Sequence, residues 1–260
     1  MPVTAWTISM DASHWTVQGL EIFGAKNHPF VCTSCTDDVF RLLDSDFHHN
    51  YDAATHGQNA DGIDIEFGSG EGNLIKGVRL FNNADDGLDL WMFTSAVTIE
   101  STWAYGNGVD RFGDTAWEGN GNGFELGGGR PSPATAHVVR NSAAWDNTAN
   151  GFTDNSNPGD LVIEGNTSFR NAANGYWFRS SAATLDRNLS VGDLRPFVAG
   201  TANRVGVNSW STTTTSTTTG ASVFVSTDPT SATGPRPADG TLPRTTFLTT
   251  RTAVLGAPMR

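Results

Sequence analysis

The segment LFNNADDGLDLWMF, residues 80–93, contains the two short motifs that recur along this chain and decide its fold. The first motif is an aromatic residue with an asparagine two positions later, here Phe81 and Asn83. The second is a glycine, here Gly87, that follows an acidic or amide residue and precedes alternating apolar residues. Such alternation between glycine and asparagine corners is typical of short β-strands joined by tight turns.

Both motifs repeat along the chain. The glycine of the second motif recurs at intervals of 25, 36, 28 and 24 residues, at Gly62, Gly87, Gly123, Gly151 and Gly175. The first motif precedes four of these copies, at Phe81/Asn83, Tyr105/Asn107, Trp145/Asn147 and Phe169/Asn171. Units of about 22–28 residues, each with about three short strands, predict an all-β protein with the fold of a parallel β-helix (solenoid). Helical solenoids fit poorly, because no segment between the strands has a helical pattern.

Stacking of the units determines where equivalent residues lie. A single coil cannot bury its own apolar face, so neighbouring coils must stack, with equivalent residues about 4.8 Å apart. We therefore expect the aromatic residues and asparagines of the first motif to form ladders. The longest interval contains an insertion at residues 109–120, which we expect to wall a groove.

The repeats also predict the division of the chain. We expect residues 1–208 to form the β-helix and to lack N-terminal coils, because the chain opens directly in strand-like sequence without a polar cap. Residues 209–222 are rich in serine and threonine and predict an exposed loop or linker, or alternatively an O-glycosylated stalk. We expect residues 223–260 to be a tail that packs on the β-helix.

Composition excludes several classes of partner. The 27 acidic and 16 basic residues give a net charge of −11, which disfavours nucleic acid and anionic membranes. No apolar run reaches the length of a membrane-spanning helix, and no signal-peptide pattern opens the chain. We therefore expect either a cytoplasmic protein or a mature or truncated form of a secreted one. Cys32 and Cys35 form a single CxxC without a second pair for zinc, and we expect packed or mutually oxidised thiols.

The strand after each glycine sends successive side chains to opposite faces. The residues expected to face inward are Ile63/Ile65, Leu88/Leu90, Phe124/Leu126, Phe152 and Tyr176/Phe178. Two outward columns remain: Asp61, Asp86, Asn122, Asn150 and Asn174 before the glycines, and Asp64, Asp89, Glu125, Thr153 and Trp177 after them. Both columns are acidic only in the first two coils, where Asp61 should lie next to Asp86.

Four carboxylates, those of Asp61, Asp85, Asp86 and Asp89, should therefore converge without a basic neighbour. Such a group is costly unless it is protonated or bridged by a hard cation. Because the ligands are all oxygen and come from a rigid scaffold of two coils, we predict that they bind Ca²⁺. The alternative is a set of Asx turn residues that point into water.

These residues resemble the family 9 polysaccharide lyases, the pectate lyase family with a right-handed parallel β-helix. The similarity covers about residues 35–250 and is carried by NADG (59–62), FNNADDGLDLW (81–91), GNGNGFELGG (119–128), ANGFTDN (149–155) and ADGTLPRTTFL (238–248). It implies that Asp61, Asp85, Asp86 and Asp89 bind an essential calcium, and that the substrate is an acidic polysaccharide. It further implies a secreted protein, longer at its N-terminus and monomeric.

One position departs from the family pattern. The family places its catalytic base, a lysine, in GNGFKLGG, whereas this chain has Glu125 at that position. The reaction is a β-elimination, in which a base removes the proton from C5 of a uronate and the C4 oxygen leaves, while calcium stabilises the charge that develops. Glu125 is therefore the candidate base if its pKa is raised, or else a further metal ligand.

Other candidates for contact with an anionic sugar chain lie on the same outward face or in the insertion. Arg111, Arg130 and Arg179 are candidate substrate-binding or base residues, or plain surface arginines. Trp91 and Trp177 project outward and either stack on sugar rings or pack under a loop. Lys76 is expected on another face of its coil.

Three functions remain open on the sequence alone. The first is a calcium-dependent lyase with an altered or relocated base. The second is a non-catalytic, calcium-stabilised β-helix that binds polysaccharide. The third is a glycoside hydrolase that uses paired carboxylates, such as Glu125 with Asp154 or Asp89.

Overall fold

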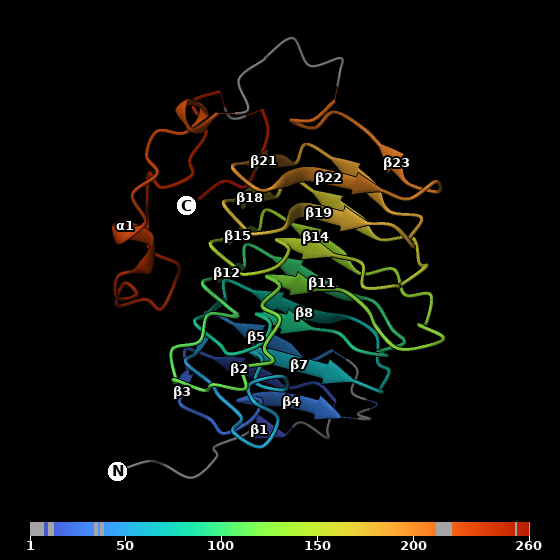
Figure 1. The fold of residues 1–260 in the computed structure, drawn as a ribbon, viewed down its shortest axis with the longest axis vertical. Coiled ribbons are helices and arrows are strands. Elements are labelled where there is room, and N and C mark those ends of the chain that lie inside the picture. Colours follow the sequence, from blue (N-terminus) through green and yellow to red (C-terminus); the bar gives the residue numbers. More distant parts are fainter. Residues whose placement is uncertain are drawn as a thin grey trace.

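The chain forms a parallel β-helix in which three sheets run along the stack (Figure 1). The computed structural model describes residues 8–9, 13–33, 36, 39–211, 220–252 and 254–259. We name the sheets A, B and C. Within these residues every paired strand of the three sheets is parallel to its neighbours. The helical elements among them are the 3-10 turn η1 (Ala221–Val223) and the single turn α1 (Thr230–Thr233).

Each coil contributes about one strand to each sheet. Sheet A consists, in order, of β1 (Ile8–Ser9), β4 (Phe30–Thr33), β7 (Ile63–Glu66), β10 (Leu88–Asp89), β13 (Phe124–Glu125), β16 (Phe152–Thr153), β19 (Asn174–Phe178) and β22 (Arg195–Ala199). Sheet B consists of β2 (Thr16–Gln18), β5 (Arg41–Leu43), β8 (Asn73–Lys76), β11 (Val97–Glu100), β14 (Val138–Arg140), β17 (Val162–Glu164), β20 (Thr184–Asp186) and β23 (Arg204–Val205). Sheet C consists of β3 (Glu21–Phe23), β6 (Asp46–His48), β9 (Arg79–Phe81), β12 (Trp103–Tyr105), β15 (Ala143–Trp145), β18 (Thr167–Phe169) and β21 (Leu189–Val191).

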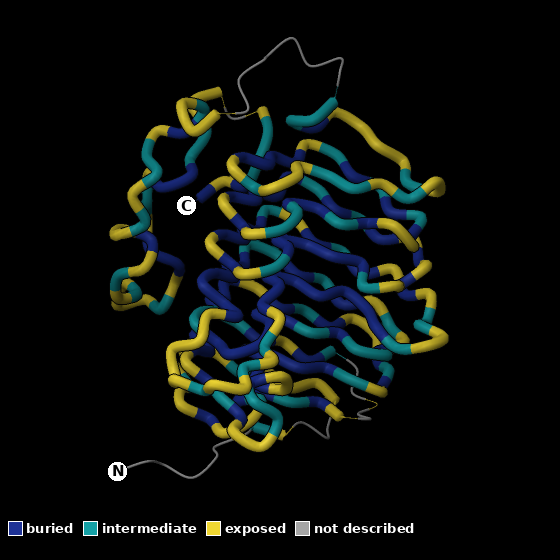
Figure 2. The backbone as a smooth tube through the Cα atoms, in the orientation of Figure 1, coloured by how far each residue is buried: buried dark blue, intermediate teal, exposed yellow. Residues whose placement is uncertain are grey.

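The core lies inside the coils, and the alternation predicted for sheet A is confirmed. All nine residues expected to face inward are buried in one apolar cluster: Ile63, Ile65, Leu88, Leu90, Phe124, Leu126, Phe152, Tyr176 and Phe178. The aromatic rings among them stack from coil to coil, with 4.8 Å between the ring centroids of Phe124 and Phe152. Figure 2 shows the buried backbone concentrated in the middle coils, with exposed residues at the turns.

The predicted ladders are also confirmed. The amide nitrogen of Asn83 donates to Asn107, Asn107 donates to Asn147, and Asn147 donates to Asn171, over 2.8–3.1 Å. These asparagines are buried, so the ladder satisfies polar groups that water cannot reach. On the outer side of sheet C the rings of Phe81, Tyr105 and Trp145 stack within 15° of parallel, and His48 continues this stack in the preceding coil.

The C-terminal segment lies along the outer side of sheet C (Figure 1). Phe247 packs edge-to-face on Trp145, with 5.1 Å between the ring centroids. Arg236 donates to the carboxylate of Asp46 at 2.7 Å, and Arg79, which also pairs with Asp46, donates to the backbone oxygen of Gly234 at 2.7 Å. The segment is thus anchored to the stack by a buried ion network as well as by apolar contacts.

Three sequence predictions concern other parts of the chain. Residues 212–219, most of the serine- and threonine-rich segment, lie outside the described residues. Cys32 is buried in β4 and disulfide-bonded, whereas Cys35 lies outside the described residues. Among the described residues, no helix has the length and hydrophobicity needed to span a bilayer.

Candidate metal centre and groove on sheet A

The two outward columns of sheet A lie side by side, as the alternation predicts. Strand pairing places Asp64 beside Asp89, Asp89 beside Glu125, and Glu125 beside Thr153. In the column before the glycines, the backbone amide of Asp86 donates to Asp61 Oδ1 at 2.8 Å, which confirms the predicted contact between these two coils. Glycine is required between the columns, because a Cβ atom on Gly87 would lie 2.5 Å from the backbone oxygen of Gly123.

The carboxylates form two overlapping groups rather than one group of four. Ligand oxygens of Asp61, Asp85 and Asp86 all lie within 4.8 Å of one another. In a second group, ligand oxygens of Asp61, Asp64 and Asp89 also lie within 4.8 Å of one another. The four residues predicted as metal ligands are thus divided between two groups that share Asp61, and Asp64 joins them.

Burial raises the pKa values of these carboxyl groups. The pKa of Asp85 rises to about 10, first because the group is desolvated and then because of the charges of Asp86 and Asp61. Desolvation foremost, and then the charges of neighbouring acids, raise the pKa values of Asp64, Asp86 and Asp89 well above the usual range; for Asp86 and Asp89 the largest of these charges is that of Glu125. A bound divalent cation would oppose both effects, because its positive charge at the centre of the cluster would favour the ionised carboxylates.

Buried carboxylate oxygens that lack a hydrogen bond indicate whether these residues fit a hard cation. Asp89 Oδ1 is buried and accepts no hydrogen bond from the described residues, and Asp64 Oδ2 likewise accepts none, although His28 Nε2 lies 3.5 Å from it. Buried carboxylate oxygens without partners are costly, and Ca²⁺ prefers such ligands. The donor set is all oxygen and therefore fits calcium better than zinc or copper.

His28 lies against the cluster from the turn before β4. Its Nδ1 atom is 3.1 Å from Asp61 Oδ2, and its Nε2 atom is 3.5 Å from Asp64 Oδ2. Burial alone would lower the pKa of His28, but the hydrogen bond to Asp61 and the charges of Asp61 and Asp64 outweigh it and raise the pKa to about 9. No motif in the sequence pointed to this residue, because His28 belongs to a less regular coil.

Glu125 lies at the edge of the cluster, on β13. Its Oε2 atom accepts a hydrogen bond from Asn122 Nδ2 at 2.8 Å, and its Oε1 atom accepts one from Asn155 Nδ2. Desolvation and the charges of Asp61 and Asp85 raise the pKa of Glu125 to about 7, despite a hydrogen bond to Asp86 that lowers it. The carboxyl group is therefore suited to accept a proton near neutral pH.

The cluster opens into a cavity of about 540 Å³. Trp91 lines this cavity and packs so closely on Gly128 that a Cβ atom there would lie 2.1 Å from the indole ring. The insertion at residues 109–120 reaches the cavity through Asn120, whose backbone amide donates to Asp85 Oδ1 at 2.7 Å. The insertion thus forms part of the wall, as expected.

The other predicted contact residues are more widely spread. Trp177 continues the column of Glu125 and Thr153, and Arg179 lies over its ring at 4.2 Å. Arg130 is exposed and does not line the cavity. Arg111 lies elsewhere, because its side chain donates to the backbone oxygen of Gly106 at 2.7 Å and lines a separate hollow beside sheet C.

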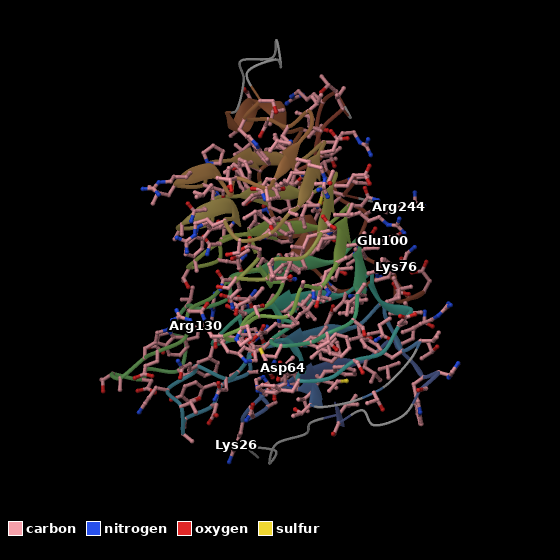
Figure 3. The ribbon with its side chains drawn as sticks, turned by 90° about the vertical axis from the view of Figure 1, so that its right-hand side faces the viewer. Lys26, Asp64, Lys76, Glu100, Arg130 and Arg244 are labelled. Atoms are coloured by element: carbon pink, nitrogen blue, oxygen red, sulfur yellow. The ribbon has the colours of Figure 1, made fainter. Side chains whose placement is uncertain are left out.

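Neither lysine of the chain lines the cavity. Lys76 projects from sheet B, on the face predicted for it, and pairs with Glu100 at 2.8 Å. Figure 3 shows Lys76 and Glu100 well away from Asp64. Asp154, a candidate partner for Glu125 in a hydrolase, accepts hydrogen bonds from the backbone amides of Ser180 and Ser181 and therefore supports a turn.

Residues 34–188, more than half of the chain, match the family model described as "Pel9A-like, right handed beta helix region". The chain belongs to this family. The match also confirms the predicted fold class, an all-β right-handed parallel β-helix.

Individual relatives agree with the Pel9A-like assignment. Pectate lyase PEL9 of Emericella nidulans is 44% identical over 175 residues, which are 60% of this chain and 42% of that protein. Pectate lyase L of Dickeya chrysanthemi is 36% identical over 220 residues, which are 83% of this chain and 50% of that protein. The crystal structure of pectate lyase Pel9A aligns with a TM-score of 0.79 and 31% identity, over 96% of this chain and 62% of that one. The chain spans about half the length of these curated relatives.

Proposed function

We propose that this chain is a calcium-dependent polysaccharide lyase that cleaves an acidic, uronate-containing polysaccharide such as pectate by β-elimination. The observation that carries the proposal is the cavity on sheet A, in which buried carboxylates converge beside a carboxyl group with a pKa near neutrality. The family assignment and the pectate lyases among the relatives support it.

Asp61, Asp85, Asp86 and Asp89 would hold the calcium in this proposal. When bound, calcium would neutralise the uronate carboxylate and stabilise the negative charge that develops next to it. The rigid coils keep the four carboxylates in place, because each belongs to a turn or strand whose backbone is paired with the next coil.

Glu125 is the proposed base. Its ionised form would accept the C5 proton, the electron pair of that C–H bond would form the C4–C5 double bond, and the C4–O bond would break. Asn122 and Asn155 donate to its two oxygens and would hold the carboxylate toward the cavity. Trp177, two coils further along the same column, and Arg179, which lies over its ring, would contact neighbouring sugar units, at about 10 Å if coils are about 4.8 Å apart.

The second candidate is a non-catalytic protein that binds acidic polysaccharide through calcium. One observation favours it: both oxygens of Glu125 accept amide hydrogen bonds, and a further hydrogen bond links this residue to Asp86. Glu125 would then be a member of the metal centre rather than a base.

A single assay separates the two candidates. The protein is incubated with polygalacturonate, with calcium or with a chelator, and ultraviolet absorbance reports the unsaturated product of elimination. We expect calcium-dependent activity that Glu125→Gln lowers by about 10² to 10⁴-fold, whereas Glu164→Gln, on sheet B, leaves it unchanged. Activity that survives Glu125→Gln would place the base elsewhere. Calcium-dependent binding of the polymer without an unsaturated product would favour the second candidate, and new reducing ends alone would indicate hydrolysis.

The same assignment supports an extracellular, monomeric protein. The disulfide of Cys32 agrees with an oxidising compartment. Secretion can be measured by locating the full-length protein after expression in its native host.

A further inference from the structure

The hollow beside sheet C, of about 520 Å³, is separate from the acidic cavity on sheet A. Three parts of the chain contribute to its lining: Phe81, Tyr105 and Trp145 of sheet C, Val109 and Arg111 of the insertion, and Thr233 of the C-terminal segment. We propose that this hollow is a second binding site for the polysaccharide, which holds a uronate unit of the chain outside the groove. The identity of the polymer rests on the proposed function; the site itself does not.

Arg111 carries a positive charge that no acid of the described residues neutralises. Its Nη1 atom donates to the backbone oxygens of Gly106 at 2.7 Å and Val109 at 3.4 Å, whereas its Nε and Nη2 atoms donate to none of the described residues. Burial lowers the pKa of Arg111, but a guanidinium group stays charged in proteins. Its Nε and Nη2 atoms lie on one edge of the group and match the two oxygens of a carboxylate.

Tyr105 supplies a second polar group without a partner. This residue lines the hollow and is only 6% exposed, and its hydroxyl forms no hydrogen bond within the described part of the chain. Burial raises the pKa of the hydroxyl, which therefore keeps its proton and can donate it. A buried donor without an acceptor is costly. Both unsatisfied groups are thus donors, which favours a ligand rich in oxygen and negatively charged.

The rest of the lining favours a sugar acid over a small inorganic anion. Asp146 is the one acid among the described lining residues, and Arg170 donates to both of its oxygens, at 3.0 and 2.9 Å. Its charge is therefore compensated. Aromatic side chains and Pro229 give the hollow an apolar side that can contact the C–H groups of a sugar ring. Its volume is in the usual range for sites that bind small organic molecules.

The insertion borders both sites. Asn120, at its end, lines the acidic cavity, whereas Val109 and Arg111, near its start, line the hollow. A polymer that passes over the insertion can therefore occupy both sites at once. The second contact then raises the effective concentration of the polymer at the groove. An oligomer that fills only one site gains nothing from the other.

Binding without calcium separates the hollow from the groove, because the groove is proposed to bind uronate through the ion. The full chain is freed of calcium on a chelating resin and titrated by calorimetry with a galacturonate trimer or with maltotriose, an uncharged trimer. We expect binding of the galacturonate trimer alone, weakened about 10- to 100-fold by Arg111→Gln and about 2- to 10-fold by Tyr105→Phe. Val109→Glu, which places a negative charge beside the guanidinium, should also abolish it. Arg41→Gln, at an exposed arginine on sheet B, is the matched control and should leave it unchanged.

Kinetics with calcium present test whether the site serves long chains. We expect Arg111→Gln to raise KM for polygalacturonate about 3- to 10-fold, with kcat and the KM for the trimer unchanged. A lower kcat on the trimer would show that Arg111 acts in the groove and would overturn the second site.

The outcomes distinguish this inference from the proposed function. Lyase activity without calcium-independent binding, equal binding of maltotriose, or binding that neither Arg111→Gln nor Val109→Glu weakens overturns the second site and leaves the proposed lyase intact. Binding that both variants weaken, in a protein that forms no unsaturated product, supports the site and overturns the proposed function. The wild-type titrations and Val109→Glu decide the matter even if circular dichroism shows that Arg111→Gln fails to fold.

Discussion

The metal-free protein should lose stability as the pH rises from 5 to 8, which is the opposite of ordinary acid denaturation. Burial and the neighbouring acids raise the pKa of Glu125 from 4.5 to about 7. Between these values the folded state therefore binds more protons than the unfolded state, and stability that is present below about pH 4.5 is lost as the pH rises through about 7. The pKa of Asp85, raised to about 10, acts in the same direction.

The contribution of Glu125 follows from its pKa. A difference of one unit between the folded and unfolded pKa values corresponds to about 1.4 kcal/mol. Because most of the difference for Glu125 takes effect between pH 5 and pH 8, the free energy of unfolding should fall by about 2 to 3 kcal/mol over this range. For a chain of this length the loss corresponds to a decrease in Tm of about 5 to 10 °C. Glu125→Gln should remove this part of the decline, and saturating calcium should abolish the decline in the wild type.

The measurement is a thermal melt followed by circular dichroism at several pH values, in chelator and in calcium. Glu164→Gln provides the control, because this residue lies on sheet B and pairs with Arg187 outside the cavity. A Tm in chelator that rises with pH over this range would show that the cluster is not held in an unfavourable charged state. A decline that Glu125→Gln does not alter would show that other carboxyl groups cause it.

Three further changes test other parts of the structure. Asn107→Ala breaks the ladder to Asn83 and Asn147 and should lower the free energy of unfolding by about 3 kcal/mol, measured by urea denaturation. Arg236→Ala removes a partner of the buried Asp46 and should lower the free energy of unfolding by about 2 to 3 kcal/mol. It should also expose the C-terminal segment to limited proteolysis, whereas resistance to protease would argue against this anchor. Trp177→Ala should weaken binding of polygalacturonate about 5- to 30-fold, measured by calorimetry in calcium, if sugar units stack there.

The repeat made most of the fold predictable. Once Gly62 and Gly87 are aligned, alternation assigns each side chain to the core or the groove, and stacking follows from the parallel strands. The contact between Asp61 and Asp86 and the ladder through Asn83 and Asn107 were therefore readable from the sequence. Such patterns are robust because one register error would move every side chain to the wrong face.

Features outside the repeat were not predictable in the same way. His28 contacts Asp61 and Asp64 from a turn whose course depends on tertiary packing. Arg111 belongs to the insertion, and it faces the backbone oxygen of Gly106 rather than the cavity because the loop folds back on its own coil. Asp64 was visible as a member of the outward column, but its separation from Asp89 and Asp61 depends on side-chain rotamers that the repeat does not fix.

The C-terminal segment fixes how many coils can lie between the two places where it is anchored to the stack. Its contacts range from Asp46, through Arg236, to Thr167, whose hydroxyl accepts the backbone amide of Ala257 at 2.8 Å. In a simple solenoid each coil touches only its neighbours, so that coils can be gained or lost without disturbing distant ones. Here one added coil between Asp46 and Thr167 would displace one set of these contacts by about 4.8 Å. The segment therefore acts as a molecular ruler, and natural variation in length should accumulate in loops or beyond the coils that it spans.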